Sequence, residues 1–176
     1  MKEQEPKSQI AIELTKREEV PAVLELIASS PDALLSVNEH EVEVWINQGY
    51  SFVAKTIDGQ IIGHQSAVVW PQSGWVEVRA AVVKPEHRGR GINTEMKKMI
   101  VKKLKSDKPE VTIVGFTEAA SKSRGILQKM GFKEIPLQET PDEFFSICPA
   151  NCVKKTGIDC GCKVFILPPK AGVKDE

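Results

Sequence analysis

Several absences narrow what this chain can do. Its 176 residues carry no net charge, with 24 basic and 24 acidic side chains, so no overall charge draws it to nucleic acid or to an anionic membrane. No apolar run approaches the roughly 20 residues that a membrane-spanning helix needs, and residues 1–7 contain no apolar signal core. We therefore expect a cytoplasmic protein that has neither nucleic acid nor a membrane as a partner.

Two common phosphate-binding motifs are also missing. The P-loop requires a glycine, four residues and then Gly-Lys-Ser/Thr, which the sequence lacks. The dinucleotide fingerprint requires three spaced glycines near the first strand, whereas the candidate loop here has two glycines and follows a middle strand. No internal repeat or low-complexity linker divides the chain, and its length suits one domain.

The hydrophobic pattern predicts one α/β domain over 8–168, between a flexible start at 1–7 and a polar tail at 169–176. Strands are predicted at 9–14, 50–56, 60–69, 75–83, 111–116, 132–135 and 163–167. A first helix should follow a capping box of Thr15 and Glu18 and end near 28, and further helices are predicted at 37–48, 92–104 and 119–130. Early strands and interleaved later helices predict a mixed sheet with helices on both faces.

The segment 76–99 is the most informative part of the sequence. An apolar strand leads to Pro85, the run RGRG follows at 88–91, and an amphipathic helix begins at once. Glycines allow backbone amides to point into one concavity, and a helix N-terminus adds unpaired N–H groups and the positive end of its dipole. This arrangement predicts a pyrophosphate site. The alternative is that the four residues only turn a strand into a helix.

The same segment resembles the central signature of the GNAT superfamily of N-acetyltransferases. The signature reads Arg/Gln-x-x-Gly-x-Gly/Ala, and RGRGIN at 88–93 occupies its six positions. A second family element, a helix ending in Leu-Tyr-Glu-Lys-Leu-Gly-Phe, corresponds to ILQKMGF at 126–132. The resemblance covers about 10–132. It implies a GNAT-like α/β fold with a mixed, mostly antiparallel central sheet of about seven strands.

The resemblance further implies acetyl-CoA as the co-substrate. The backbone at the strand end would bind the pantetheine arm through Ala81, Val82 and Val83. The pyrophosphate would be held by the loop and the first helical turn, at Arg88, Gly89, Arg90, Gly91, Ile92 and Asn93. Ser123, near the start of the later helix, would add a contact. An amide near Ala81 and Val82 would stabilise the developing oxyanion.

Members of this family move an acetyl group to a primary amine by direct attack in a ternary complex. Glu77 stands where the family often has a glutamate that accepts the amine proton, so it is our candidate catalytic base; the alternative is an exposed carboxylate on an alternating strand. His64 is a second candidate, which we expect to face solvent. Arg79 and Arg124 are expected to be salt-bridged surface groups. The partner would be a small-molecule or peptide amine, and a homodimer is compatible with the sequence.

Three positions depart from the family pattern. Asn93 replaces glycine or alanine, Ala120 replaces a common asparagine, and Leu127 replaces a tyrosine that often protonates the leaving thiolate. The resemblance places Leu127 toward the thioester sulfur, where leucine cannot donate a proton, and the chain's only tyrosine is Tyr50. These departures keep open a non-catalytic acyl-CoA-binding or sensor module as an alternative function.

Four cysteines lie within fifteen residues, in an insert at 148–162: Cys148, Cys152, Cys160 and Cys162. A tetrahedral metal site, with zinc as the expected ion, is one interpretation, although the spacing is not the Cys-x₂-Cys of common zinc ribbons. Disulfides, which are rare in a mesophile cytosol, and unmodified thiols are the others. A metal-responsive protein is therefore a further alternative function.

Overall fold

The computed structural model describes residues 10–30, 37–118, 123–145 and 161–169. Its strands are β1 Ala11–Leu14, β2 Ser51–Lys55, β3 Ile61–Val69, β4 Val76–Val83, β5 Ile113–Glu118, β6 Lys133–Ile135 and β7 Cys162–Leu167. They form a seven-stranded sheet in the order β1-β2-β3-β4-β5-β7-β6. Strands β4 and β5 pair in parallel, whereas β1 with β2, β2 with β3, β5 with β7 and β6 with β7 pair antiparallel. The predicted fold class is confirmed, and each predicted strand is present within two residues at either end.

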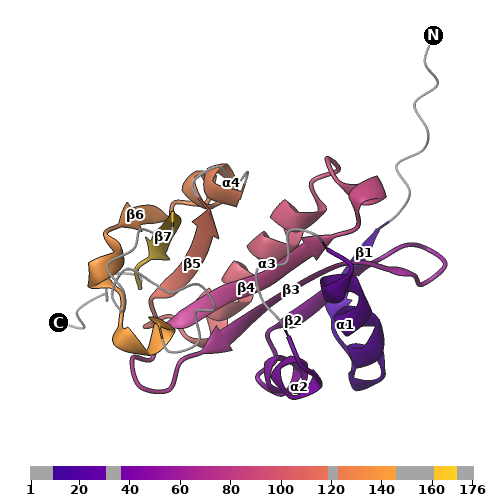
Figure 1. Cartoon of the computed structure of the whole chain (residues 1–176), viewed down its shortest axis with the longest axis horizontal. Helices are drawn as coiled ribbons and strands as arrows, with labels where there is room; N and C mark the ends of the chain where they lie inside the picture. Colours follow the sequence, from indigo (N-terminus) through magenta and orange to yellow (C-terminus); the bar gives the residue numbers. More distant parts are fainter. Residues whose placement is uncertain (1–9, 31–36, 119–122, 146–160, 170–176) are drawn as a thin grey trace, which may run out of the picture. The chain divides into compact units, whose positions relative to one another are not determined.

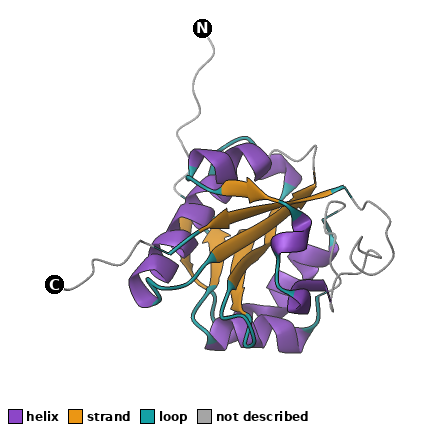
Figure 2. Cartoon of the chain, turned by 90° about the vertical axis from the view of Figure 1, so that its left-hand side faces the viewer, coloured by secondary structure: helices purple, strands orange, loops and turns teal. Residues whose placement is uncertain are grey.

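The helices complete the architecture (Figure 1). They are α1 Val20–Ala28, α2 Glu39–Asn47, α3 Ile92–Asp107 and α4 Ser123–Lys129, with 3-10 turns η1 Arg17–Glu19, η2 Pro85–His87, η3 Leu137–Glu139 and η4 Asp142–Phe145. Figure 2 distinguishes these helices from the strands and the loops. No helix within the described ranges is long and apolar enough to cross a membrane.

The start of the first helix differs from the predicted capping box. The hydroxyl of Thr15 is buried against Ser51 on β2, so it does not cap the helix. The backbone N–H of Lys16 instead donates to the carboxylate of Glu19 at 2.8 Å. The capping residue is therefore Lys16 and not Thr15, because Ser51 on β2 holds the threonine hydroxyl. Asn38, by contrast, caps α2 as predicted and accepts the N–H of Glu41.

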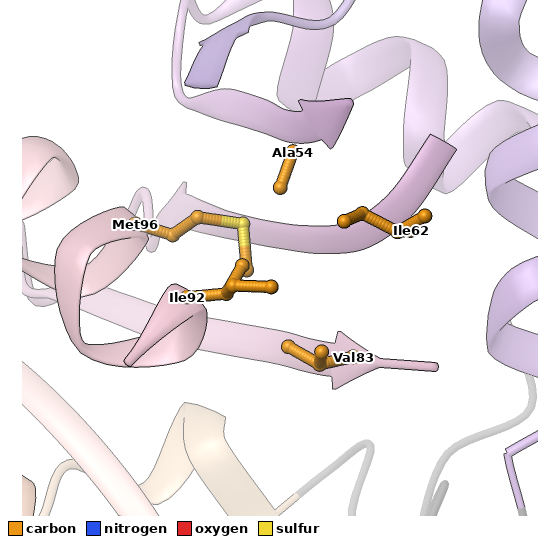
Figure 3. Packing of buried hydrophobic residues seen from close by; sticks show 5 residues of the cluster. All are labelled: Ala54, Ile62, Val83, Ile92 and Met96. Atoms are coloured by element: carbon orange, nitrogen blue, oxygen red, sulfur yellow. The ribbon is translucent and has the colours of Figure 1, made fainter. Parts of the chain in front are cut away.

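The chain divides into two compact units, one formed by 1–66 and 80–97 and the other by 67–79 and 98–176. In the first unit, Ile92 and Met96 of α3 pack with Ala54, Ile62 and Val83 (Figure 3). A Cβ at Gly63 would lie 3.2 Å from Cε of Met96 and 3.3 Å from Cβ of Ala54, so this strand position has little room for a side chain.

The two faces of β3 carry different neighbours within this first unit. Gly63 faces α3, and the next residue, His64, stacks on Trp45 of α2 with ring centroids 5.9 Å apart. Successive strand residues point to opposite faces, so α2 and α3 cover opposite faces of this part of the sheet. Helices on both faces, as predicted, are therefore present in this unit.

The second unit has an aromatic core of its own. Phe144 of η4 is buried, and its ring lies 5.0 Å from Trp70, 5.4 Å from Phe116 and 6.0 Å from Trp75, between ring centroids. The carboxylate of Glu143 accepts backbone N–H groups in the β3–β4 turn, at 3.2 Å and 2.7 Å. These contacts hold η4 against the turn that leads into β4.

Candidate active site

The loop between β4 and α3 is built from a 3-10 turn and two left-handed glycines. The N–H of Arg88 donates to the carbonyl of Pro85 at 3.2 Å, and its side-chain Nε donates to the carbonyl of Val83 at 3.0 Å. Gly89 and Gly91 have φ angles of +78° and +80°, which glycine adopts far more readily than other residues. The arginine therefore ties the loop to the end of β4, while the glycines reverse its path into the helix.

Helix α3 presents its first amides at the end of this loop. The N–H of Glu95 donates to the carbonyl of Gly91, so Gly91 caps the helix and the amides of the next three residues precede the first intrahelical bond. A Cβ built at Gly89 or Gly91 meets no atom within 4 Å. The space beside the loop is therefore open, as an anion-binding loop requires. Of the six amides predicted to hold a pyrophosphate, that of Arg88 is already used inside the loop.

Two side chains in the first turns of α3 carry buried polar groups. The Oδ1 atom of Asn93 is buried and has no hydrogen-bond partner within the described residues. Lys97, one turn later, is 5% exposed, and burial lowers the pKa of its ammonium group to about 8. The open glycine loop and the helix N-terminus fit the phosphate-bearing arm of CoA. The hydrophobic pattern did not single out Lys97, because it places this residue among several lysines on the polar face of the predicted helix.

Strand β4 is irregular immediately before the residues predicted to bind the pantetheine arm. Ala80 has a φ angle of +52° and is the one non-glycine residue in the described chain with a positive φ. Val82 and Val83 are buried, whereas Ala81 is exposed. A left-handed residue breaks the regular pleat of a strand, so the peptide groups around Ala80 leave the ordinary ladder geometry. Nothing in the sequence indicated this irregularity.

His64 does not face solvent, and that expectation is wrong. Its side chain is 0% exposed, because it lies between Trp45, Ser51 and the backbone of Ala80. Burial lowers the pKa of the imidazole to about 4, although its bond to the Ala80 carbonyl favours the charged form. Both ring nitrogens are engaged, at 3.0 Å and 3.1 Å. His64 therefore cannot serve as the proton acceptor of a substrate.

Glu77 is buried, not the exposed carboxylate that the alternative interpretation required. Its residue exposure is 8%, and its Oε2 atom accepts the indole N–H of Trp70 at 3.2 Å. Arg79, two residues along β4, places NH1 3.8 Å from the same oxygen. Arg79 is also buried, so the prediction that it lies on the surface is wrong. Within the described residues, both contacts of the carboxylate fall on Oε2.

The surroundings of Glu77 set its proton affinity. Burial raises the pKa of the Glu77 carboxyl, and the Arg79 guanidinium and the Trp70 N–H offset part of that rise. A carboxylate with a raised pKa is a stronger proton acceptor than an exposed one. Perturbed acids of this kind concentrate at functional sites. The sequence identified Glu77 but not Trp70, whose N–H reaches it only because the β3–β4 turn folds back.

Leu127 is not at a surface from which it could reach a ligand. It is 2% exposed, and its Cδ1 atom lies 3.1 Å from the position that a Cβ would take on Gly115. The expectation that it points toward the thioester sulfur is therefore wrong, because the side chain fills the space over the glycine of β5. Ser123 begins α4 and is half-buried. Arg124 forms a partly exposed ion pair with Glu134 at 3.3 Å.

Only one of the four predicted cysteine ligands lies within the described residues. Cys148, Cys152 and Cys160 lie outside the described residues, as does Ala120. Cys162 begins β7, where it pairs with Glu118 of β5. Across the described ranges, no group of three or more His, Cys, Asp or Glu side chains is arranged to hold a metal ion. The zinc hypothesis for the four cysteines stays a prediction.

Comparison with known proteins assigns the family. Residues 20–132 match the model of the acetyltransferase (GNAT) family, which is more than half of the 176 residues. The chain belongs to this family and carries a GNAT-type N-acetyltransferase domain. No curated protein sequence matches it.

Solved structures share the fold at low sequence identity. A putative acetyltransferase from Acinetobacter baylyi is 16% identical with a TM-score of 0.69, and the match covers 98% of this chain and 100% of that one. A Mycobacterium tuberculosis protein in complex with CoA and NLQ is 18% identical with a TM-score of 0.65, covering 90% and 98%. The ribosomal-protein-S18-alanine N-acetyltransferase of Escherichia coli is 14% identical with a TM-score of 0.66, covering 94% and 98%.

Proposed function

We propose that this protein transfers an acetyl group from acetyl-CoA to a primary amine by direct attack in a ternary complex. The observation that carries the proposal is Glu77, a buried carboxylate with a raised pKa on the strand that leads to the glycine loop. A site that must deprotonate an ammonium substrate benefits from a carboxylate of raised pKa, since transfer of that proton has to precede or accompany attack.

The co-substrate would be held by the β4 end, the loop and the first turn of α3. Open space beside Gly89 and Gly91 allows close approach of phosphate oxygens to the backbone. The amides at the start of α3 would donate to them, and the buried ammonium of Lys97 would add charge. The family match and a CoA-bound structural relative support this assignment. The acetyl thioester supplies the activated carbonyl carbon.

Glu77 would accept the amine proton through the oxygen that Trp70 and Arg79 leave unoccupied. Those two residues fix the orientation of the carboxylate by holding Oε2. The neutral amine then attacks the carbonyl carbon. When the tetrahedral adduct collapses, the C–S bond breaks, the thiolate of CoA leaves, and the nitrogen loses its second proton to solvent. A free thiol has a pKa of about 8.5, so the thiolate is a competent leaving group near neutral pH. No side-chain acid in the place of the family tyrosine is needed.

The acceptor would be a small-molecule or peptide amine. The structural relatives include an enzyme named for an alanine of ribosomal protein S18 and a Neisseria gonorrhoeae N-acetylglutamate synthase solved with coenzyme A and N-acetyl-glutamate. The match covers 36% of the synthase chain. These relatives support both kinds of acceptor and do not choose between them. The rival function is a module that binds acyl-CoA without turning it over.

The test combines binding with turnover. Calorimetry measures acetyl-CoA binding to the full chain, and thiol release is then followed over a panel of polyamines, amino acids, aminoglycosides and peptide N-termini. Amine-dependent thiol release that is lost in Glu77→Gln supports the proposal. Tight acetyl-CoA binding without amine-dependent release from any acceptor favours the binding module. Absence of acetyl-CoA binding overturns both.

A further inference from the structure

A chain of hydrogen bonds runs through the interior of the first unit and ends on the backbone of β4. Oγ1 of Thr15 lies 2.8 Å from Oγ of Ser51, and that hydroxyl lies 3.0 Å from Nε2 of His64. Nδ1 of His64 then lies 3.1 Å from the carbonyl oxygen of Ala80. All three side chains are buried, so the chain is closed to solvent along its length.

The directions of the two His64 bonds follow from the Ala80 carbonyl. A carbonyl oxygen can only accept, so Nδ1 of His64 must carry the proton and donate to Ala80. A neutral imidazole then has a lone pair on Nε2, and it is neutral at physiological pH because burial lowers the pKa of His64 to about 4. Nε2 of His64 is therefore the acceptor in its contact with the Ser51 hydroxyl. The tautomer of His64 is fixed by its neighbours.

Ala80 is the residue that most needs such support. Its φ of +52° lies in the left-handed region, which strains an L-residue, and strain of this kind persists only where the surroundings over-determine it. The His64 ring is itself fixed by stacking on Trp45 at an interplanar angle of 26°. A rigid donor is therefore aimed at the carbonyl of a strained residue.

One peptide group joins the Ala80 carbonyl to the N–H of Ala81. The group is planar, and no described peptide bond is cis, so the N–H points opposite to the C=O. Because the carbonyl of Ala80 is drawn inward to His64, the N–H of Ala81 is turned the other way. Ala81 is exposed, and it is one of the two residues whose amides we expect near the thioester carbonyl.

We propose that His64 is a positioning residue: through the Ala80 carbonyl it sets the direction of the Ala81 N–H that polarises the acyl carbonyl of the co-substrate. The inference rests on the proposed function, since it names a supporting residue for that same site. It gives the strained geometry of β4 a role in the reaction. It also explains why a histidine lies buried in β3 with both nitrogens engaged.

Two matched substitutions separate the bonds that His64 makes. In His64→Asn the side-chain amide nitrogen occupies the position of Nδ1 and can donate to Ala80, but nothing accepts from Ser51. In His64→Gln the side-chain amide reaches the position of Nε2 and can accept from Ser51, but nothing donates to Ala80. Both variants are uncharged and smaller than histidine. A purely structural role predicts similar losses of stability and similar kinetics for the two.

The proposal predicts a split between them. His64→Gln should lower kcat about 10-fold or more. Removal of an oxyanion donor lowers kcat by about 10²–10³-fold, and an Ala81 N–H that points in the wrong direction should cause part of that loss. KM for acetyl-CoA should change little, and His64→Asn should retain most of the wild-type kcat. Calorimetry supplies a readout independent of turnover. The preference for acetyl-CoA over CoA should fall in His64→Gln and persist in His64→Asn.

Equal kcat values and equal acetyl-CoA preferences in the two variants would overturn the inference while leaving the proposed function intact. Failure of the wild-type protein to bind or turn over acetyl-CoA would instead remove the proposed function. If His64→Gln does not fold, the same pair is compared in the Ala80→Gly background, where glycine adopts the left-handed conformation without a Cβ penalty. A lower kcat for glutamine than for asparagine there supports the inference, and equal values overturn it.

Discussion

The indole N–H of Trp70 donates to Oε2 of Glu77 at 3.2 Å, seven residues along the chain and across the β3–β4 turn. This bond and the nearby Arg79 hold one carboxylate oxygen while burial raises the pKa of the group. The two contacts fix the orientation of Glu77, and burial raises its proton affinity. Both properties can be tested separately.

Glu77→Gln tests the base. The amide is nearly isosteric and can still accept from Trp70, so the fold should persist. We expect kcat/KM to fall by about 10²–10⁴-fold at pH values above the raised pKa of Glu77, where the wild-type carboxylate is ionised. The ratio of wild type to variant should narrow as the pH falls, because protonation inactivates the wild-type base. Parallel pH–rate profiles for the two proteins would remove Glu77 from the mechanism.

Trp70→Phe tests the tuning of that base. Phenylalanine keeps an aromatic ring beside Phe144 but cannot donate, and the Trp70 bond lowers the pKa of Glu77. The acidic limb of the kcat/KM profile should therefore move to higher pH. Trp75→Phe is the matched control, because Trp75 also contacts Phe144 but its indole is not the donor to Glu77. If the acidic limb of the kcat/KM profile moves equally in both variants, the Trp70 bond does not set the pKa of Glu77.

Gly91→Glu tests the loop. The new carboxylate would enter the open space predicted to hold phosphates, so CoA affinity should fall by at least about 100-fold, or 2.7 kcal/mol. The φ of +80° means that the substitution also strains the backbone. Gly59→Glu is the control, since Gly59 has a φ of +85° and a similarly open Cβ position in the β2–β3 hairpin. Calorimetry that finds equal CoA affinity in the two variants would exclude this position from the binding site.

Leu127→Tyr tests the corrected position of Leu127. The larger ring has no room over Gly115, so we expect a loss of about 1–3 kcal/mol in the free energy of unfolding and no gain in kcat. Gln128→Tyr introduces the same side chain at an exposed position of α4 and should change stability by no more than about 0.5 kcal/mol. Denaturant unfolding measures both. A stable and faster Leu127→Tyr enzyme would show that the position faces the reaction after all.

Lys97→Met tests a conflict between stability and binding. The folded-state pKa of about 8 lies below the ordinary 10.5, so the unfolded chain binds the proton more tightly. The buried charge therefore lowers the free energy of unfolding. This loss is fully present below pH 8 and disappears above about pH 10.5. Methionine should therefore raise the free energy of unfolding near pH 7 by up to about 3 kcal/mol, while weakening CoA binding. Lys98→Met, at an exposed position, should do neither. A destabilised Lys97→Met would mean that the ammonium has a partner.

The sequence by itself determined the fold class, the strand and helix order and the identity of the glycine loop. These rest on local causes. Alternating apolar residues predict strands, Asn38 caps its helix through its own side chain, and glycines at 89 and 91 supply left-handed backbone that other residues resist. Glu77 could also be named from its place on the motif strand. Such features could be predicted because they depend mainly on residues that are neighbours in the chain.

Only the tertiary structure decided what surrounds those residues. The capping role expected of Thr15 was lost to Ser51, 36 positions away, and Leu127 turned inward because Gly115 leaves a space that it fills. His64, expected to face solvent, became a buried neutral donor because Trp45, Ser51 and Ala80 converge on it from other elements. Burial and proton affinity depend on contacts between distant parts of the chain. Periodicity within one strand therefore cannot distinguish a solvent-facing histidine from one held in the core.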